Sequence, residues 1–368
     1  MKVYLLRSIY ISACCLFLSS AVNTQLKTDP VSRQVLQSSG KGLFDADDIL
    51  NITLKGNLHD LLNDRSGEPK NFPITLSYKN EDSAEVSIAV NVKTRGHFRR
   101  AKGNCAYPPL LIQFSKTNSS SPSYFNGQAK LKLVMPCRGD EYVVHEWLVY
   151  KLYNLVTTES LRARLVRVKV DDEKNNKQYP LFFGMLLEDE KQMAKRNNEV
   201  IVDRKLSPEQ TLPETFLTMA VFQYLIGNTD WSVQYQQNIK LIAGDSLAVP
   251  GVVPYDFDHA GIVNAPYALP AEELQMSSVR ERRYRGFCIH DMHEYDSTIA
   301  FYNGLKKDIY SLYTTCSLLD EKYIKATVHY LDQFYSTINN PRELDKEFGY
   351  PCDKNGTGNV IIRGLKED

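Results

Sequence analysis

The feature that most constrains the fold is a change in the spacing of apolar residues near position 143. Before it, short segments alternate apolar and polar residues or are rich in β-branched side chains, which predicts β-strands. From 143 onward, helical spacing appears, interrupted by two strand-like segments. We therefore expect a β-rich first part and a mostly helical second part, an order typical of two lobes with a cleft between them. The expected strands are 49–54, 72–78, 84–94, 110–114, 130–135, 163–170 and 179–187, and the expected helices include 143–156, 214–226 and 323–338.

The composition is that of an ordinary globular protein. Of the 368 residues, 43% are hydrophobic and 24% are charged, which argues against a disordered chain. The 44 basic residues are balanced by 44 acidic ones, so the formal net charge is zero. A chain without a basic excess lacks the overall attraction to nucleic acid, and we expect no nucleic-acid partner.

The N-terminus has the three parts of an export signal. Residues 1–21 begin with basic side chains, continue with a short apolar run over 9–18 and end in small residues at 19–21. The run is too short to span a bilayer as a helix. We therefore expect a signal peptide over 1–21, a flexible lead-in over 22–43, and a protein that is secreted, periplasmic or on the cell surface.

Two further observations concern the exported form. Residues 11–14 fit a bacterial lipoprotein cleavage pattern, and lipid on Cys14 would anchor the chain to a membrane, so soluble export and anchoring both stay open. Cleavage after position 21 would leave five cysteines, some of which should pair in an oxidising compartment, with at least one left over. Their spacing contains no zinc-type pattern, and the pairing stays open. The five are Cys105, Cys137, Cys288, Cys316 and Cys352.

The polar residues that indicate chemistry flank an expected β-hairpin. The sequence GNTDW, which contains Asp230, follows an apolar helix, and Asn238 lies eight residues further on. The segment 238–243 is predicted to be a short strand, and Asp256 and Asp258 follow within the sequence YDFDH. Because a hairpin folds back on itself, it can bring the groups at its two ends together. Carboxylate and amide oxygens are the ligands that Mg²⁺ prefers, usually together with substrate phosphates.

This order of motifs resembles the catalytic core of protein-kinase-like phosphotransferases. GNTDW, Asn238 and YDFD are most similar to the HipA-like kinases and to the secreted spore-coat CotH kinase family. The resemblance implies an α+β, two-lobed protein-kinase-like fold. Its β-rich N-lobe would span 44–189 and its mostly helical C-lobe 190–340, followed by a C-terminal tail over 341–368.

The resemblance also implies roles for residues upstream of GNTDW. Lys132 would hold the nucleotide phosphates, and Lys130, on the same face of the same strand, is the alternative. Glu146 would pair with Lys132, as the helix acid of a kinase does. Arg95, in an Arg-Gly element similar to one in the CotH family, would contact the nucleotide. Glu188, which lies where a kinase places the hinge between its lobes, would contact it as well.

Downstream, the resemblance implies the metal and proton-transfer groups. Asp230 would accept the proton of the acceptor hydroxyl, and Asn238 with Asp256 or Asp258 would hold Mg²⁺ or Mn²⁺. The cofactors expected on this basis are the metal ion and ATP or another nucleotide. The acceptor is a protein, a glycan or a small molecule, and the sequence does not distinguish these.

Three functions fit these residues. The first is an exported kinase-like phosphotransferase. The second is a kinase-like cell-surface or coat protein that binds without catalysis, favoured by the lack of a GxGxxG phosphate loop. The third is a metal-dependent hydrolase, with Asp230, Asp256, Asp258 and His259 as ligands. Four arginines within 279–285 are interpreted either as a solvated charged face or as an anion site.

Overall fold

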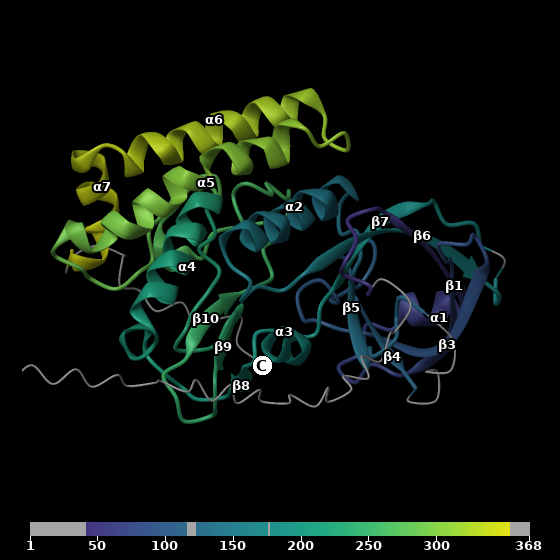
Figure 1. Cartoon of the computed structure of the whole chain (residues 1–368). Coiled ribbons are helices and arrows are strands. Elements are labelled where there is room, and N and C mark those ends of the chain that lie inside the picture. The colour runs from purple at the N-terminus through teal and green to yellow at the C-terminus, as the bar shows by residue number, and fades with distance from the viewer. Residues whose placement is uncertain (1–41, 116–122, 176, 354–368) are drawn as a thin grey trace, which may run out of the picture. The chain divides into compact units, whose positions relative to one another are not determined.

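Seven strands of the first part close into a barrel (Figure 1). The computed structural model describes residues 42–115, 123–175 and 177–353, so the expected signal peptide and nearly all of the lead-in lie outside the described residues. The strand order around the barrel is β1-β2-β3-β4-β5-β7-β6, with β1 and β6 parallel and the other neighbours antiparallel. The strands are β1 (Leu50–Gly56), β2 (Phe72–Lys79), β3 (Glu85–Thr94), β4 (Leu110–Phe114), β5 (Lys130–Val134), β6 (Ala163–Asp172) and β7 (Phe182–Leu187).

The closed barrel shows that the expected two-lobed kinase-like fold is wrong. That fold has an open sheet in its N-lobe, whereas here β1 pairs with β2 on one side and with β6 on the other. The parallel pairing runs from Leu50 opposite Val166 to Gly56 opposite Asp172, and closure leaves no free edge strand. The prediction failed because the spacing of apolar residues identifies strands but carries no information on a pairing between segments roughly 116 residues apart.

The barrel has its own apolar core. Along β3, Ile88, Val90 and Val92 are buried while the residues between them are exposed, which is the period of two that a strand with one buried face requires. Helix α1 (Leu58–Asn63), which the sequence did not predict, adds three buried leucines to this core. The interior is therefore filled by side chains.

The second part is mainly helical and has a second core. Helix α2 packs against β6 and β7 and also against α5, so it contacts both parts of the chain. A small antiparallel sheet in the order β10-β9-β8 lies beside α4, and α5 and α6 run side by side (Figure 1). The elements are α2 (Glu141–Val156), α3 (Glu190–Arg196), β8 (Val200–Val202), α4 (Pro213–Ile226), β9 (Ile239–Ala243), β10 (Gly251–Pro254), α5 (Asp296–Thr314), α6 (Glu321–Ile338) and α7 (Pro341–Phe348), with short 3₁₀ helices at Pro208–Gln210, Glu272–Leu274, Met292–Tyr295 and Tyr350–Cys352.

Two glycines fix the loop that follows α4. The helix ends at Gly227, which has a left-handed φ of 67°, and a Cβ there would lie 1.9 Å from the hydroxyl oxygen of Tyr330. The amide of Gly261 donates to the Gly227 carbonyl at 3.0 Å, and a Cβ on Gly261 would lie 2.2 Å from the carbonyl oxygen of Val279. Neither position has room for a side chain, so the chain leaves α4 in one direction.

Two disulfides join distant segments. Cys105 pairs with Cys137 and Cys288 with Cys352, while Cys316 is a free thiol. Disulfides of this kind are compatible with an extracellular protein. Within the described residues, no helix combines the length and the apolar character needed to cross a membrane.

Candidate functional site

The loop after α4 orients Asp230 through its neighbour Asn228. Asn228 is buried, and its side-chain amide donates to Gln223 Oε1 at 3.0 Å. Its Oδ1 accepts from the Asp230 amide at 3.0 Å, and its carbonyl accepts from the Trp231 indole at 3.1 Å. This Asx-type turn gives the GNTDW sequence a defined local structure and places the Asp230 carboxylate on the hairpin side of the loop.

The β9–β10 hairpin brings the next polar groups to Asp230. At its base the Tyr255 amide donates to the Asn238 carbonyl at 3.0 Å, so the two ends of the hairpin lie opposite each other. The Asn238 amide donates to the Asp230 carbonyl at 2.8 Å and to Asp230 Oδ2 at 3.0 Å. Both Asn238 and Asp256 have left-handed backbones, with φ of 51° and 63°, a conformation that costs free energy and is common at functional sites.

Three acids, Glu146, Asp256 and Asp258, form the group that we call the carboxylate cluster. Glu146 on α2 is 2% exposed and Asp258 is 6% exposed. The guanidinium of Arg99 lies between them, with Nη1 3.9 Å from Glu146 Oε2 and 3.7 Å from Asp258 Oδ2. The Tyr267 hydroxyl donates to the same Asp258 oxygen at 3.1 Å. The ends of the hairpin, the α2 helix and the loop before β4 therefore meet at this point.

The carboxylate cluster carries more negative charge than Arg99 neutralises. Burial and the charge of Asp258 raise the pKa of both Glu146 and Asp256, and for Glu146 the rise is large. Burial also raises the pKa of Asp230, and the charge of Asp258 adds to the rise. Oxygen Oε1 of Glu146 has no hydrogen-bond partner among the described residues although it is buried. Such perturbed acids are typical of sites that bind or transform a ligand.

Cationic and aromatic side chains border Asp256. The Lys132 ammonium lies 3.6 Å from Glu190 Oε2 and 5.1 Å from the centre of the Tyr255 ring, and Lys240 lies 5.4 Å from the same ring. Burial and the charge of Arg95 lower the pKa of Lys132, while Glu190 and Asp256 act in the opposite direction. Lys132, Lys240 and Arg95 therefore offer positive charge beside the carboxylate cluster, which suits an anionic ligand that also contacts a metal ion.

The expected pair of Lys132 with Glu146 is not formed. Glu146 faces Arg99, and Lys132 pairs instead with Glu190, the first residue of α3. The reason is topological. Strand β5 carries Lys132 and pairs with β7, which leads directly into α3, so the start of α3 lies close to Lys132.

Glu188, for which a contact with the nucleotide was expected, uses its carboxylate in contacts within the protein. Its carboxylate is 1% exposed and forms ion pairs with Arg162 at 3.1 Å and with Arg196 at 3.0 Å, one through each oxygen. Both oxygens are thus occupied by arginines. Lys130 lies on the same face of β5 as Lys132, as expected, but its side chain is 43% exposed and its ammonium is 3.3 Å from Asp189.

Three of the four arginines within 279–285 donate to backbone carbonyls, and Arg283 instead contacts the side chain of Tyr350. Arg282 donates to the carbonyls of Tyr224 and Leu225 at 3.0 and 3.2 Å, at the last turn of α4. Arg285 donates to the carbonyls of Thr229 and Trp231 in the loop that follows. Arginines at a helix C-terminus bind carbonyls that have no partner within the helix. These two side chains therefore hold the loop in place, and the interpretation as an anion site does not describe them.

Several residues of the site were not singled out from the sequence. They are Arg99, Glu190, Lys240, Tyr255 and Tyr267. Tyr255 opens the YDFD sequence, so its proximity to Asp256 could have been expected. The other residues carry no local signal, because their positions depend on which strands and loops pack together.

The donor set of the carboxylate cluster suits a hard divalent cation. All its ligand atoms are oxygens, and one buried oxygen, Oε1 of Glu146, lacks a partner among the described residues. Mg²⁺ commonly takes only one or two protein carboxylates and completes its shell with phosphates and water. The carboxylates of the cluster do not form a group of three ligand atoms within 4.8 Å of one another, so a metal ion there would rely on one or two of them together with ligand phosphates. Within the described residues, such a group is formed by Cys288, His290 and Cys352, but its two sulfurs form a disulfide.

The chain matches no protein-family model and no curated protein. The function is therefore argued from the geometry of the site itself.

Proposed function

We propose that this protein is an exported phosphotransferase that uses Mg²⁺ or Mn²⁺ to move a phosphoryl group from ATP or another nucleotide to an acceptor hydroxyl. The observation that carries the proposal is the position of Asp256. Asp256 follows β10, opposite Asn238, whose side-chain amide donates to Asp230 Oδ2 at 3.0 Å. Asp258 of the carboxylate cluster lies two residues further on, and the ring of the preceding Tyr255 lies 5.1 Å from the Lys132 ammonium. A phosphoryl-transfer site needs these groups, an acid for the metal, a cation for the phosphates and an acid for the hydroxyl, within one small region.

Each residue has a role that follows from its surroundings. Asp256, with Asn238, would hold the metal ion, which neutralises phosphate charge when it is bound. Lys132 and Arg95 would contact the phosphates. Asp230 would receive the proton of the acceptor hydroxyl, and because burial raises its pKa, it is a better proton acceptor than an exposed aspartate. The two hydrogen bonds from Asn238 hold the Asp230 side and main chain in position.

The resemblance to CotH and HipA-like kinases supports the proposal through the order of the motifs alone. The acceptor is a protein, a glycan or a small molecule. The proposal includes export of the chain, either as a secreted protein or attached to the cell surface, with or without lipid on Cys14. The two disulfides favour an oxidising compartment.

The proposal is tested first by nucleotide binding to the full exported chain. Melting temperatures and calorimetric titrations are measured with ATP, with and without Mg²⁺. We expect metal-dependent binding that Lys132→Met weakens at least about tenfold, since a charge-assisted contact to phosphate is lost. Lys130→Met is the matched control. It removes the same charge on the same strand, two residues before Lys132, and the Lys130 side chain is 43% exposed. Equal loss in both variants, or no nucleotide binding to the wild type, would contradict the proposal.

Transfer is tested separately from binding. With γ-labelled ATP and candidate acceptors, Asp230→Asn should keep metal-dependent nucleotide binding and lose phosphoryl transfer. Asp256→Asn should lose both. Release of phosphate that is insensitive to Lys132→Met would instead indicate the metal-dependent hydrolase.

A binding protein without catalysis is the second candidate, and Arg99 is the observation that favours it. A fixed guanidinium between Glu146 and Asp258 supplies positive charge where a second metal ion would otherwise bind. Nucleotide binding that does not depend on Mg²⁺, together with no transfer by the wild type, would select this candidate over the phosphotransferase.

A further inference from the structure

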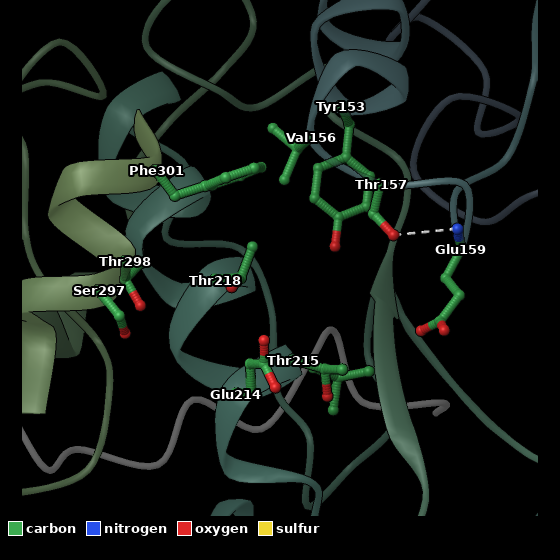
Figure 2. Close-up of a pocket in the computed structure, with 11 residues that line it drawn as sticks. Tyr153, Val156, Thr157, Glu159, Glu214, Thr215, Thr218, Ser297, Thr298 and Phe301 are labelled. Carbon is green, nitrogen blue, oxygen red and sulfur yellow. Dashed lines mark hydrogen bonds between the residues drawn. The ribbon is translucent and has the colours of Figure 1, made fainter. Parts of the chain in front are cut away.

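A cavity outside the carboxylate cluster has the features of a ligand site (Figure 2). Its volume is about 300 Å³, and its walls come from α2, α4, β10 and α5 together with the loop after α2. Ligand cavities in proteins begin at about this size. The side chains that line it include Tyr153, Glu159, Glu214, Thr215, Thr218 and Phe301.

The cavity is negatively charged. Glu159 and Glu214 line it, and no lysine, arginine or histidine does. Within the part of the chain that the structure describes, neither carboxylate has an ion-pair partner. Burial raises the pKa of Glu159, and burial together with the charge of Glu159 raises the pKa of nearby Glu199, whose Oε2 is buried without a partner. A cationic ligand would relieve this uncompensated charge.

The hydroxyl of a mostly buried tyrosine also points into the cavity without a partner. Tyr153 is 3% exposed, and its hydroxyl has no hydrogen bond to the described residues. Figure 2 shows this hydroxyl directed into the space above Thr215 and Thr218, whose side chains lie on the facing helix. A phenolic hydroxyl in this position can both donate a hydrogen bond to a ligand and accept one from it.

An aromatic ring closes one side. Phe301 is 41% exposed and reaches across the cavity from α5, as Figure 2 shows. An aromatic face next to carboxylates is a common environment for an organic ammonium group, since the ring attracts the cation and also contacts its methylene chain. The carboxylates do not belong to any group of three ligand atoms within 4.8 Å among the described residues, so the geometry suits an extended organic cation better than a metal ion.

We propose that this cavity binds a small organic polycation, of the size and charge of a linear alkyl diamine. One ammonium group would form an ion pair with Glu159. It would also donate a hydrogen bond to the hydroxyl oxygen of Tyr153. The second would extend toward Glu214 at the more open end, and the alkyl chain would lie along Phe301. This inference does not depend on the proposed phosphotransferase activity.

The experiment uses calorimetric titration of the full exported chain with 1,4-diaminobutane, and with 1,4-butanediol as the neutral probe of equal length. We expect the diamine to bind and the diol not to bind. Glu159→Gln should weaken diamine binding about tenfold or more, and Glu214→Gln, at the exposed end, about threefold. Tyr153→Phe, which removes one oxygen and keeps the ring, should weaken it about threefold to tenfold.

Glu209→Gln is the matched control, because Glu209 is an exposed acid that does not line the cavity. Its variant should bind the diamine like the wild type. Equal binding of diamine and diol, no binding of the diamine, or diamine binding that Glu159→Gln and Tyr153→Phe leave unchanged would each overturn the proposal. Preferential binding of a neutral sugar would do the same.

Discussion

Replacing Arg99 by methionine tests whether the carboxylate cluster is held by a single cation. Arg99 is 11% exposed at its side chain, and its guanidinium also donates to the carbonyl of Met135. Methionine fills a similar volume and removes the charge. Glu146 and Asp258 would then be buried without a counter-charge.

The size of the effect follows from the geometry. Breaking a buried ion pair by removing one partner typically costs about 3–5 kcal/mol, because the remaining charge stays desolvated. The distances of 3.7 and 3.9 Å are longer than an ideal charge-assisted hydrogen bond, so we expect the lower end, about 3 kcal/mol. For a segment of about 300 residues the unfolding entropy is about 0.6 kcal/mol/K, so Tm should fall by about 5 °C.

The loss should grow with pH. Burial and the charge of Asp258 raise the pKa of Glu146, and Arg99 lowers it, so removing Arg99 raises it further. A folded-state pKa above the unfolded value means that the folded state holds more protons, so stability falls as pH rises through the folded pKa. The variant should therefore be closest to the wild type below about pH 4, where glutamate is protonated in both states, and furthest from it above neutrality.

The assay is urea unfolding of both proteins from pH 4 to pH 8, followed by circular dichroism. Arg342→Met is the control, because Arg342 lies exposed at the start of α7 and should change the free energy of unfolding by less than about 0.5 kcal/mol. Equal midpoints for Arg99→Met and the wild type at pH 8, or a loss that is largest at pH 4, would refute the reasoning.

Three further predictions concern stability. Replacing Cys105 and Cys137 by serine opens a loop with a sequence separation of 32 and should cost about 3.7 kcal/mol in urea unfolding. Arg282→Lys loses the fork that binds the last carbonyls of α4 and should cost about 2 kcal/mol, with nucleotide binding unchanged. Burial lowers the pKa of His145 to about 4, and its Nδ1–H donates to the Val263 carbonyl. Because the unfolded state then binds the proton more tightly, the free energy of unfolding of the wild type should fall by about 3 kcal/mol as pH drops from 6.5 to below 4. His145→Asn should remove that part of the pH dependence.

Part of the candidate site could be predicted because it lies on adjacent sequence. GNTDW follows a helix that must end at Gly227, and Asn238 and Asp256 lie at the two ends of one short hairpin. Local turn chemistry and hairpin geometry are sufficient to bring such groups together. The partners of Lys132 and Glu146 could not be predicted in this way, since each lies on an element whose neighbour is set by long-range packing.

The sequence by itself determined most of the barrel strands and the longer apolar helices, but not the short helix α1. The period of two in 84–94 and the helical spacing in 143–156 and 214–226 correspond to β3, α2 and α4 within two residues at each end. Periodicity determines these elements because each must bury one face, whichever surface covers it.

Only the tertiary structure decided how the elements combine. The parallel pairing of β1 with β6 closes a barrel where an open kinase-like sheet was expected. Because α3 lies close to β5, Lys132 forms an ion pair with Glu190, and Glu146 pairs with Arg99. Such contacts join segments far apart in the chain, so they depend on the free energy of the whole packed core, and the spacing of residues along one segment does not encode them.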